Sequence, residues 1–391
     1  MRTIGVVTVG RSDYGIYLPI LRQIQNDPEL RLRLFVGGAH LSERHGLTIR
    51  AIEADGFSEI ERVPMLAEAD TPEGIAQSIG QGVIGFSQAY GRSRPDILLI
   101  LGDRFEMFSA AVAALPFNLP VAHLHGGEIT LGAIDDALRH AMTKLSHLHF
   151  VSTAEYARRV IQLGEAPWRV ILSGAPGLDH LQTLEWLSRC QLEARLGMDL
   201  SQPTLLVTFH PVTLEPGQAQ AQIGALLTAL EACDLPAIFT LPNADSGGQA
   251  ITAAIKTFVN RHPNCRLVDN LGTQAYFSLM KVAAAMVGNS SSGLVEAPSL
   301  GLPVVNIGLR QAGRVRGQNV IDVPCTPSAI LAGIQQAVNL EFKTSLARST
   351  NPYQQGNAAE IIVHHLKSVI IDQTLLIKSF HDLNSSLNQA E

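Results

Sequence analysis

The stretch VGNSSSGLVEAPSLGLPVVNIG, residues 287–308, decides the fold class. Residues 283–287 and 303–307 are apolar runs typical of buried strands. The segment between them cannot form a long helix, because Pro298 lacks an N–H donor and Gly301 is a helix-stop residue. A strand, a small-residue turn, a short helix and a second strand make one βαβ unit, which predicts a parallel sheet.

The turn inside this unit carries three consecutive serines, at residues 290–292. The exposed N–H groups at a helix start suit a phosphate, so the turn predicts an anion site. Simple helix capping is the alternative interpretation, and it needs one hydroxyl. Three serines exceed that need, which favours the anion site.

The bulk composition limits the classes of protein to consider. The chain has 391 residues, of which 46% are hydrophobic, with a net charge of −6. This length predicts two or three domains, and the acidic balance argues against non-specific nucleic-acid binding. No signal peptide or run of about 20 apolar residues is visible, so we expect a cytoplasmic protein with no membrane partner. Four scattered cysteines without CxxC spacing predict neither a zinc site nor a disulfide framework.

Short apolar runs alternate with helical patterns along the whole chain, which predicts α/β architecture with parallel sheets. The first series has expected strands at 3–9, 32–36, 60–63, 97–101, 120–124 and 149–152, with helices at 16–26, 47–54, 72–90, 105–114, 135–145 and 154–163. After a Gly- and Pro-punctuated linker, a second series has expected strands at 204–208, 237–241, 266–268, 283–287 and 303–307, and a helix at 358–369 follows.

Polar clusters follow nearly every expected strand, where open α/β sheets bind their ligands. They are GRSDYG, LGDRFE, HLHGGEITLGAIDDALRHA, FHPVT, LPNADSGG and IGLRQAGRVRG. Each has a structural alternative: Asp135 suits a helix start, Arg139 suits a surface, His147 and His149 suit a structural role, and the arginines at 314 and 316 suit a solvated loop. GRSDYG is not a dinucleotide fingerprint.

Taken together, these motifs resemble the hydrolysing UDP-N-acetylglucosamine 2-epimerases of bacterial sialic acid biosynthesis. The resemblance covers residues 4 to 365, in order and at family spacing. It implies a GT-B architecture, in which two Rossmann-like domains face each other across a cleft. The implied domains are residues 1–172, completed by a C-terminal helix at 353–375, and residues 173–352, which bind UDP; residues 376–391 form a tail.

The resemblance also implies a role for individual residues. The residues implied to bind UDP are Arg11, Arg104, His210, Asn243, Leu271, Ser290, Ser291, Glu296 and Arg310. The residues implied to supply acid and base groups at the sugar are Asp103, His125, Glu128 and Asp135. Many relatives read HIEGGE where this chain reads HLHGGE, so a catalytic carboxylate of theirs is matched by His125, which can serve as acid or base near neutral pH.

The implied reaction converts UDP-N-acetylglucosamine and water to N-acetylmannosamine and UDP through a 2-acetamidoglucal. It requires no cofactor and no metal, because arginines and a helix start stabilise the leaving diphosphate. We expect a homo-oligomer, a dimer or tetramer, with a UDP-sugar as substrate. A 2-epimerase of the UDP-2,4-diacetamido-trideoxy hexose of the legionaminic acid pathway, a GT-B glycosyltransferase, a non-hydrolysing 2-epimerase and a nucleotide-sugar sensor remain alternatives.

Overall fold

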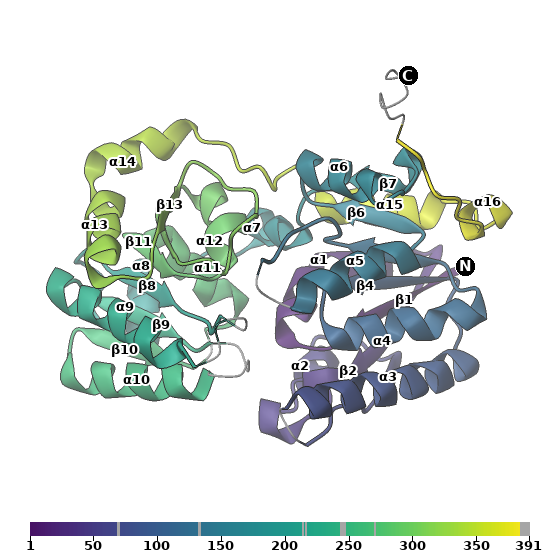
Figure 1. The fold of residues 1–391 in the computed structure, drawn as a ribbon, viewed down its shortest axis with the longest axis horizontal. Coiled ribbons are helices and arrows are strands. Elements are labelled where there is room, and N and C mark those ends of the chain that lie inside the picture. Colours follow the sequence, from purple (N-terminus) through teal and green to yellow (C-terminus); the bar gives the residue numbers. More distant parts are fainter. Residues whose placement is uncertain are drawn as a thin grey trace, which may run out of the picture. The chain divides into compact units, whose positions relative to one another are not determined.

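The computed structural model describes residues 1–68, 71–131, 134–212, 215, 217–242, 248–269 and 271–383. The chain divides into two compact units, each built on its own sheet (Figure 1). The first unit is Met1–Glu128, Ile134–Asp179 and Tyr353–Glu391. The second unit is Ile129–Ala133 and His180–Pro352.

The first unit has a seven-stranded parallel sheet in the order β3-β2-β1-β4-β5-β6-β7. Its strands are β1 (Arg2–Thr8), β2 (Leu30–Gly37), β3 (Ile60–Val63), β4 (Ile97–Leu101), β5 (Val121–Leu124), β6 (Leu148–Val151) and β7 (Val170–Leu172). The strand order reverses between β1 and β4, and ligands of open α/β sheets bind beyond the carboxyl ends at such a point.

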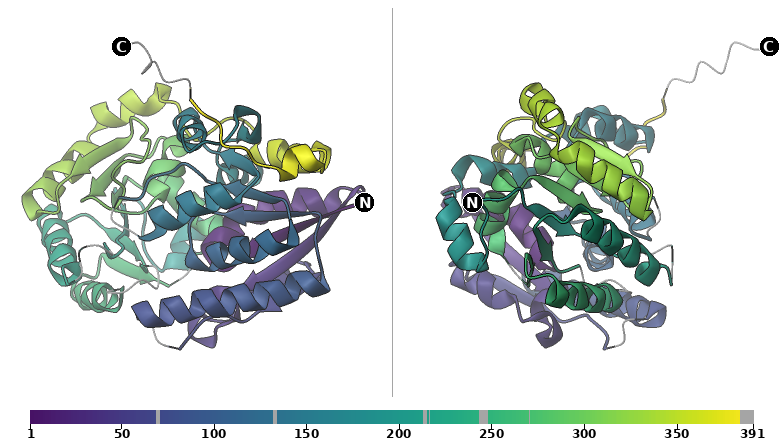
Figure 2. Two further views of the ribbon diagram at one scale, coloured as in Figure 1. Left: turned by 45° about the vertical axis from the view of Figure 1, so that its right-hand side comes forward. Right: turned by 90° about the vertical axis from the view of Figure 1, so that its left-hand side faces the viewer.

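Helices flank this sheet. They are α1 (Arg11–Asn26), α2 (Ile49–Ala54), α3 (Pro72–Arg92), α4 (Phe105–Ala114), α5 (Ile134–Leu145), α6 (Ala154–Gln162), α15 (Ala358–Ser368) and α16 (Gln373–Leu376). Helices α3 and α4 lie side by side, as Figures 1 and 2 show, and α4 also contacts α5. Helix α1 packs against α15, so the last helices of the chain complete the first unit.

The C-terminal segment after α15 is held against the end of α5. Lys378 Nζ donates to the carbonyl oxygens of Thr143 at 3.3 Å and Lys144 at 2.9 Å. It also pairs with the buried carboxylate of Glu165 at 2.8 Å. Arg169 donates to the carbonyl oxygens of Thr374, Leu375 and Ile377. Lys378 therefore anchors the segment that follows α16 to the end of α5, the helix whose first turn carries Asp135 and Asp136, while Arg169 holds α16.

The second unit has a six-stranded parallel sheet in the order β10-β9-β8-β11-β12-β13. Its strands are β8 (Leu205–Thr208), β9 (Ala237–Thr240), β10 (Cys265–Val268), β11 (Ala285–Gly288), β12 (Val304–Ile307) and β13 (Val320–Val323). Alternate residues serve two cores: Leu205 and Val207 face one apolar cluster, and Leu206 faces the other. The sheet is therefore buried on both faces, which explains why its strands read as continuous apolar runs.

The helices of the second unit are α7 (His180–Thr183), α8 (Arg189–Leu196), α9 (Ala219–Cys233), α10 (Gly248–Arg261), α11 (Gly272–Val282), α12 (Ser292–Val295), α13 (Pro327–Val338) and α14 (Leu340–Ser345). Residues of α9, α10 and α13 supply the first apolar cluster, and residues of α8 and α11 supply the second. The order of this sheet reverses between β8 and β11, which marks the expected ligand position in this unit.

The α/β fold class with parallel sheets is confirmed. Two edge strands, β7 and β13, were not predicted; they are three and four residues long and only partly buried, which is too short for a clear strand pattern. Helix α1 begins at Arg11, five residues before the predicted start at residue 16, because the SDYG segment continues the helix. Within the described residues, no helix has the length and apolar character that crossing a membrane requires.

Candidate active site

Acidic and basic side chains meet where β4 and β5 end in the first unit. Asp103 and Arg104 follow β4, while His125 and Glu128 follow β5. The two strands are paired to their last residues, Leu101 opposite Leu124, so both loops leave the sheet at the same edge. This brings together all four residues that the resemblance placed in a sugar site, once α5 adds Asp135.

Arg139 of α5 organises this edge. It is 1% exposed, so the surface alternative considered for it is wrong. Its guanidinium forms an ion pair with Asp103, lies 3.0 Å from Asp136 Oδ1 and donates to the carbonyl oxygen of Glu128 at 2.9 Å. One buried cation therefore ties the loop after β4, the loop after β5 and the first turn of α5 together. Sequence reasoning missed this role, because no local pattern distinguishes a buried arginine from an exposed one.

His125 and Glu128 form a close pair. His125 Nδ1 lies 2.8 Å from Glu128 Oε1, and Ser152 Oγ donates to the same oxygen at 3.4 Å. His125 has a φ of +63°, a conformation that is uncommon for residues other than glycine. The following Gly127, at a φ of +78°, packs so closely on α6 that a Cβ would lie 2.5 Å from Tyr156 O. The HGGE segment is therefore a tight turn that presses against α6 and holds the His125–Glu128 pair.

Asp135 has an environment that favours its protonated form. Burial raises its pKa to about 6, and the charge of nearby Asp103 raises it as well. Arg104 and Arg139 act in the opposite direction but do not cancel these effects. A carboxyl group with a pKa near neutrality can deliver a proton at physiological pH, which suits general acid catalysis.

The turn between β1 and α1 adds a second buried network. Asp13 Oδ2 accepts from Thr8 Oγ1 at 2.6 Å and from Val9 N at 2.8 Å, and Thr8 Oγ1 also lies 3.0 Å from His40 Nε2. Burial raises the pKa of Asp13 to about 6. This network fixes the turn from which the exposed Arg11 begins α1. Sequence reasoning quoted Asp13 within GRSDYG but assigned it no role.

Arg104 precedes α4 and faces a buried acid. Its Nε lies 3.3 Å from Oε2 of Glu106, whose side chain is 1% exposed. The charge of Arg104 also lowers the pKa of both Asp13 and Asp135, although burial dominates in each case. The charge of Arg104 therefore acts on both the β1–α1 network and the acid cluster of this unit.

In the second unit, the loops after β8 and β11 are joined by one asparagine. Asn289 Oδ1 accepts from His210 N at 2.7 Å, and Asn289 Nδ2 donates to His210 O at 2.8 Å. Gly288 precedes it at a φ of +141°, where a Cβ would lie 1.9 Å from Thr208 O. No other residue fits this approach, because any side chain would collide with the neighbouring strand. The hydrogen bonds of Asn289 and the close packing of Gly288 therefore fix the backbone at the start of the serine turn.

The three serines differ in their surroundings. Burial raises the pKa of the Tyr276 phenol to about 12, and the nearby Ser292 hydroxyl acts in the opposite direction. Ser290 Oγ accepts from Ser292 N at 3.4 Å. Helix α12 is only four residues long, so backbone N–H groups and hydroxyls, with little macrodipole, must provide any anion binding. Tyr276 was not singled out from the sequence.

The loop after β12 folds back onto the same turn. Arg310 Nη1 donates to Asn289 O at 3.2 Å, and the buried Gln311 donates to it through Nε2 at 2.9 Å. Burial and then the charge of Arg310 lower the pKa of His210 to about 3, so its imidazole is neutral. Arginine and neutral histidine thus lie beside the serine turn.

The remaining predicted residues take varied positions. Leu271 precedes α11, and its carbonyl oxygen already accepts from Arg195 at 2.8 Å. Glu296 follows α12. Asn243 lies outside the described residues. Arg316 forms a 2.8 Å ion pair with Asp322 of β13, so this arginine has a structural role in its loop. Among the described residues, no group of three or more histidine, cysteine, aspartate or glutamate side chains is arranged to hold a metal ion.

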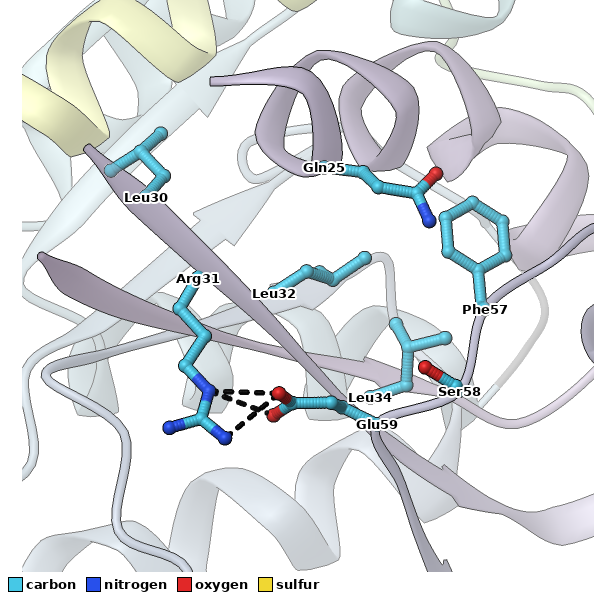
Figure 3. A pocket seen from close by; sticks show the side chains of 8 residues that line it. All are labelled: Gln25, Leu30, Arg31, Leu32, Leu34, Phe57, Ser58 and Glu59. Carbon is cyan, nitrogen blue, oxygen red and sulfur yellow. Dashed lines mark hydrogen bonds and ion pairs between the residues drawn. The ribbon is translucent and has the colours of Figure 1, made fainter. Parts of the chain in front are cut away.

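A hollow of about 230 Å³ lies elsewhere in the first unit, at the amino half of β2 (Figure 3). It is lined by apolar side chains and by the Arg31–Glu59 ion pair, whose closest N–O distance is 2.8 Å. Both partners are partly exposed, and none of the acid–base residues lines it. Since ligands of such sheets bind at the carboxyl ends of the strands, we do not regard this hollow as the active site.

Comparisons with known proteins give one family. The model for UDP-N-acetylglucosamine 2-epimerase matches residues 22–367. The chain is 40% identical to the GDP/UDP-N,N'-diacetylbacillosamine 2-epimerase (hydrolyzing) of Campylobacter jejuni, over 98% of this chain and 99% of that one. It is 37% identical to the polysialic acid biosynthesis protein P7 of Escherichia coli, over 98% of both. The crystal structure of the Neisseria meningitidis UDP-GlcNAc 2-epimerase bound to UDP-GlcNAc superposes with a TM-score of 0.81 at 19% identity, over 94% of this chain and 99% of that one.

Proposed function

We propose a substrate for this chain, which belongs to the UDP-N-acetylglucosamine 2-epimerase family and is a hydrolysing 2-epimerase of a UDP-sugar. The proposed substrate is UDP-N,N'-diacetylbacillosamine. The products are then UDP and free 2,4-diacetamido-2,4,6-trideoxymannose. The observation that carries this choice is the 40% identity with the Campylobacter jejuni enzyme along nearly the whole of both chains.

UDP-N-acetylglucosamine, the substrate expected from the sequence, is the second candidate. It is supported by the 37% identity with a polysialic acid biosynthesis protein. The reaction at C1 and C2 is the same for both sugars, which differ at C4 and C6. Because the sugars share the reacting atoms, the acid–base residues of the first unit support the reaction class and leave the choice of sugar open.

We assign UDP to the second unit. Ser290 and Ser291 donate to the diphosphate, and Arg310 neutralises its charge. Glu296 accepts from the ribose hydroxyls, and His210, Asn243 and Leu271 complete the nucleotide site, with the carbonyl of Leu271 shared with Arg195. The support for this assignment is the position of the serine turn at the reversal of strand order, where nucleotides bind in this class of sheet.

We assign the sugar to the first unit. Its cluster holds Asp103, His125, Glu128 and Asp135. Arg11 and Arg104, also of this unit, are assigned to the UDP. The C2 proton of a 2-acetamido sugar is only weakly acidic, so its removal needs a well-placed base and a stabilised leaving group. The support for this assignment is the meeting of these groups at the carboxyl ends of β4 and β5.

Product analysis in deuterium oxide tests the proposal. UDP-N,N'-diacetylbacillosamine, its GDP counterpart and UDP-N-acetylglucosamine are compared at equal concentration, with chelator present and no cofactor added. We expect the first to react with the highest kcat/KM and to give equimolar UDP and a free manno sugar with deuterium at C2. A preference for UDP-N-acetylglucosamine would select the second candidate. Protium retained at C2, or a product still attached to the nucleotide, would reject the hydrolysing epimerase reaction.

A further inference from the structure

The C-terminal strap, residues 370–381, follows α15 and includes α16. It lies beyond residue 367, where the match to the family model ends. Arg169 donates to three carbonyl oxygens of α16 and of the residue after it. At the other end of the strap, His381 N donates to Gly164 O at 2.9 Å. The strap is therefore fixed to the first unit on both sides of its central lysine.

That lysine, Lys378, holds the end of α5. Its Nζ donates to the carbonyl oxygens of Thr143 at 3.3 Å and Lys144 at 2.9 Å, and also to that of Ser146. Helix α5 ends at Leu145, and the carbonyl groups of the last turn of a helix have no regular intrahelical donor. A cation at this end also opposes the negative end of the helix dipole. The side chain of Lys378 is 14% exposed, so a largely buried charge satisfies these groups.

A row of buried polar groups leads from the same lysine to the loop after β4. Lys378 Nζ lies 2.8 Å from Glu165 Oε2, and this oxygen lies 3.0 Å from His149 Nε2. His149 is in register with His123 of the neighbouring strand β5, so the two completely buried rings lie side by side. His123 Nε2 donates to Gly102 O at 2.8 Å. Gly102 is the first residue of the loop that carries one of the acids of the cluster.

Helix α5 itself joins Lys378 to the acid cluster. Its first turn carries Asp135, and Arg139, one turn further, forms an ion pair with Asp103. A rise of 1.5 Å per residue puts Asp135 about 14 Å from Lys144 along the helix axis. Over this length a helix is a rigid element, so a shift at one end is passed to the other. One buried cation therefore fixes α5 near its start, and a second fixes its end.

We propose that Lys378 is a positioning residue for the reaction. By holding the last carbonyl groups of α5, it fixes the acid groups of the first turn against the loops after β4 and β5. This inference rests on the proposed function, which assigns those acid groups to the sugar. A displacement of reacting groups by about 1 Å can reduce turnover about 100-fold, so the loss of Lys378 acts on kcat. The nucleotide, which we assign to the other unit, is bound as before.

Lys378→Met keeps an unbranched side chain and removes the charge and the donors. We expect kcat to fall at least about tenfold, while KM and the UDP affinity measured by calorimetry stay within about twofold of the wild type. Lys378→Arg restores a cationic donor and should recover at least about a third of the wild-type kcat. Lys367→Met is the matched control, because Lys367 of α15 pairs at 2.9 Å with Asp27, which follows α1. It should lose stability and keep kcat within about twofold.

Hydrogen exchange of the α5 amides tests the positioning without turnover. In Lys378→Met, exchange should become at least about fivefold faster along the whole helix, including residues 138–141 next to the turn of Asp135. In Lys367→Met, α5 should exchange at the wild-type rate. Full kcat in a folded Lys378→Met would overturn the proposal, as would faster exchange confined to the last turn. Absence of wild-type turnover with every nucleotide sugar would instead reject the proposed function, and the exchange result would still decide whether Lys378 fixes α5.

A milder variant serves if Lys378→Met does not fold. The Phe380 side chain is exposed, lies against Gly164 where a Cβ would collide with it, and has Lys144 Nζ 5.1 Å from its ring centroid. Phe380→Ala should loosen the strap, lower kcat about threefold and accelerate exchange in α5. Unchanged kcat and unchanged exchange in Phe380→Ala would contradict a role of the strap in the reaction.

Discussion

The side chain of Asn289 holds both backbone polar groups of His210. Oδ1 accepts from His210 N at 2.7 Å and Nδ2 donates to His210 O at 2.8 Å, while the carbonyl of Asn289 receives Gln311 at 2.9 Å. Asn289 is completely buried. One residue therefore links the loops after β8, β11 and β12, where we assign the nucleotide.

Asn289→Ala should weaken both the fold and UDP binding. The substitution removes the hydrogen bonds that Asn289 makes to the buried N–H and C=O of His210, at about 1–3 kcal/mol each. We expect a loss of about 2–4 kcal/mol in urea unfolding and at least a tenfold loss of UDP affinity by calorimetry. Asn306→Ala is the matched control, because Asn306 is also buried in this sheet but bonds to the Asp322 side chain. It should lose stability and keep its UDP affinity; normal affinity in a folded Asn289→Ala would move the nucleotide site elsewhere.

Arg139→Lys should reduce turnover and leave UDP affinity unchanged. A lysine has a single ammonium group and cannot contact Asp103, Asp136 and the Glu128 carbonyl with the fork geometry of a guanidinium. The acid–base groups would then lose their fixed spacing, so we expect kcat to fall by about 100-fold or more. Steady-state kinetics and calorimetry measure the two effects.

Arg158→Lys, at an exposed position about one turn into α6, is the control and should leave kcat within twofold of the wild type. If Arg139→Lys retains full kcat in a folded protein, the buried arginine is a stabilising residue without influence on the reaction.

The sequence predicted the fold where strands are buried on both faces, because such strands are continuous apolar runs. It failed at β7 and β13, which are only three and four residues long and partly buried, so no extended apolar run marks them. The candidate sites were recognisable because polar residues follow the strands of a parallel sheet. The ion pairs of Arg139 and the hydrogen bonds of Asn289 could not be recognised from the sequence, because both join segments that are distant in the chain. Contacts of that kind depend on the tertiary fold and leave no local pattern.

Glu165→Gln should destabilise the first unit in a pH-dependent manner. Its fully buried carboxylate lies 2.6 Å from Lys144 Nζ, 2.8 Å from Lys378 Nζ and 3.0 Å from His149 Nε2. Burial opposes ionisation, but the hydrogen bonds from these partners lower its pKa to about 2. Because the folded pKa is below the unfolded value, this stabilisation is complete above about pH 4.5 and is lost as the pH falls toward 2.

At pH 7 we expect Glu165→Gln to lose about 3–5 kcal/mol of unfolding free energy, because two lysines remain without their anion. Its stability should then vary less than that of the wild type between pH 4.5 and 2. Glu155→Gln removes an exposed pair with Arg159 and should change stability by about 0.5 kcal/mol or less. Urea titrations at several pH values make the comparison. Equal acid sensitivity of Glu165→Gln and the wild type would contradict the lowered pKa.

The last prediction concerns the pH dependence of the reaction. If Asp135 must be protonated, kcat/KM of the wild type should decline as the pH rises above about 6, the pKa of this group in the free enzyme. Asp103→Asn removes the charge that raises this pKa and keeps an oxygen for Arg139. The decline should therefore begin at lower pH, and each pH unit of displacement should reduce kcat/KM at pH 7 about tenfold. Asp136→Asn also removes a carboxylate beside Arg139, but Asp136 is not among the main causes of the raised pKa, so its profile should stay close to that of the wild type. A profile of Asp103→Asn that coincides with the wild-type profile would show that a group other than Asp135 controls the decline.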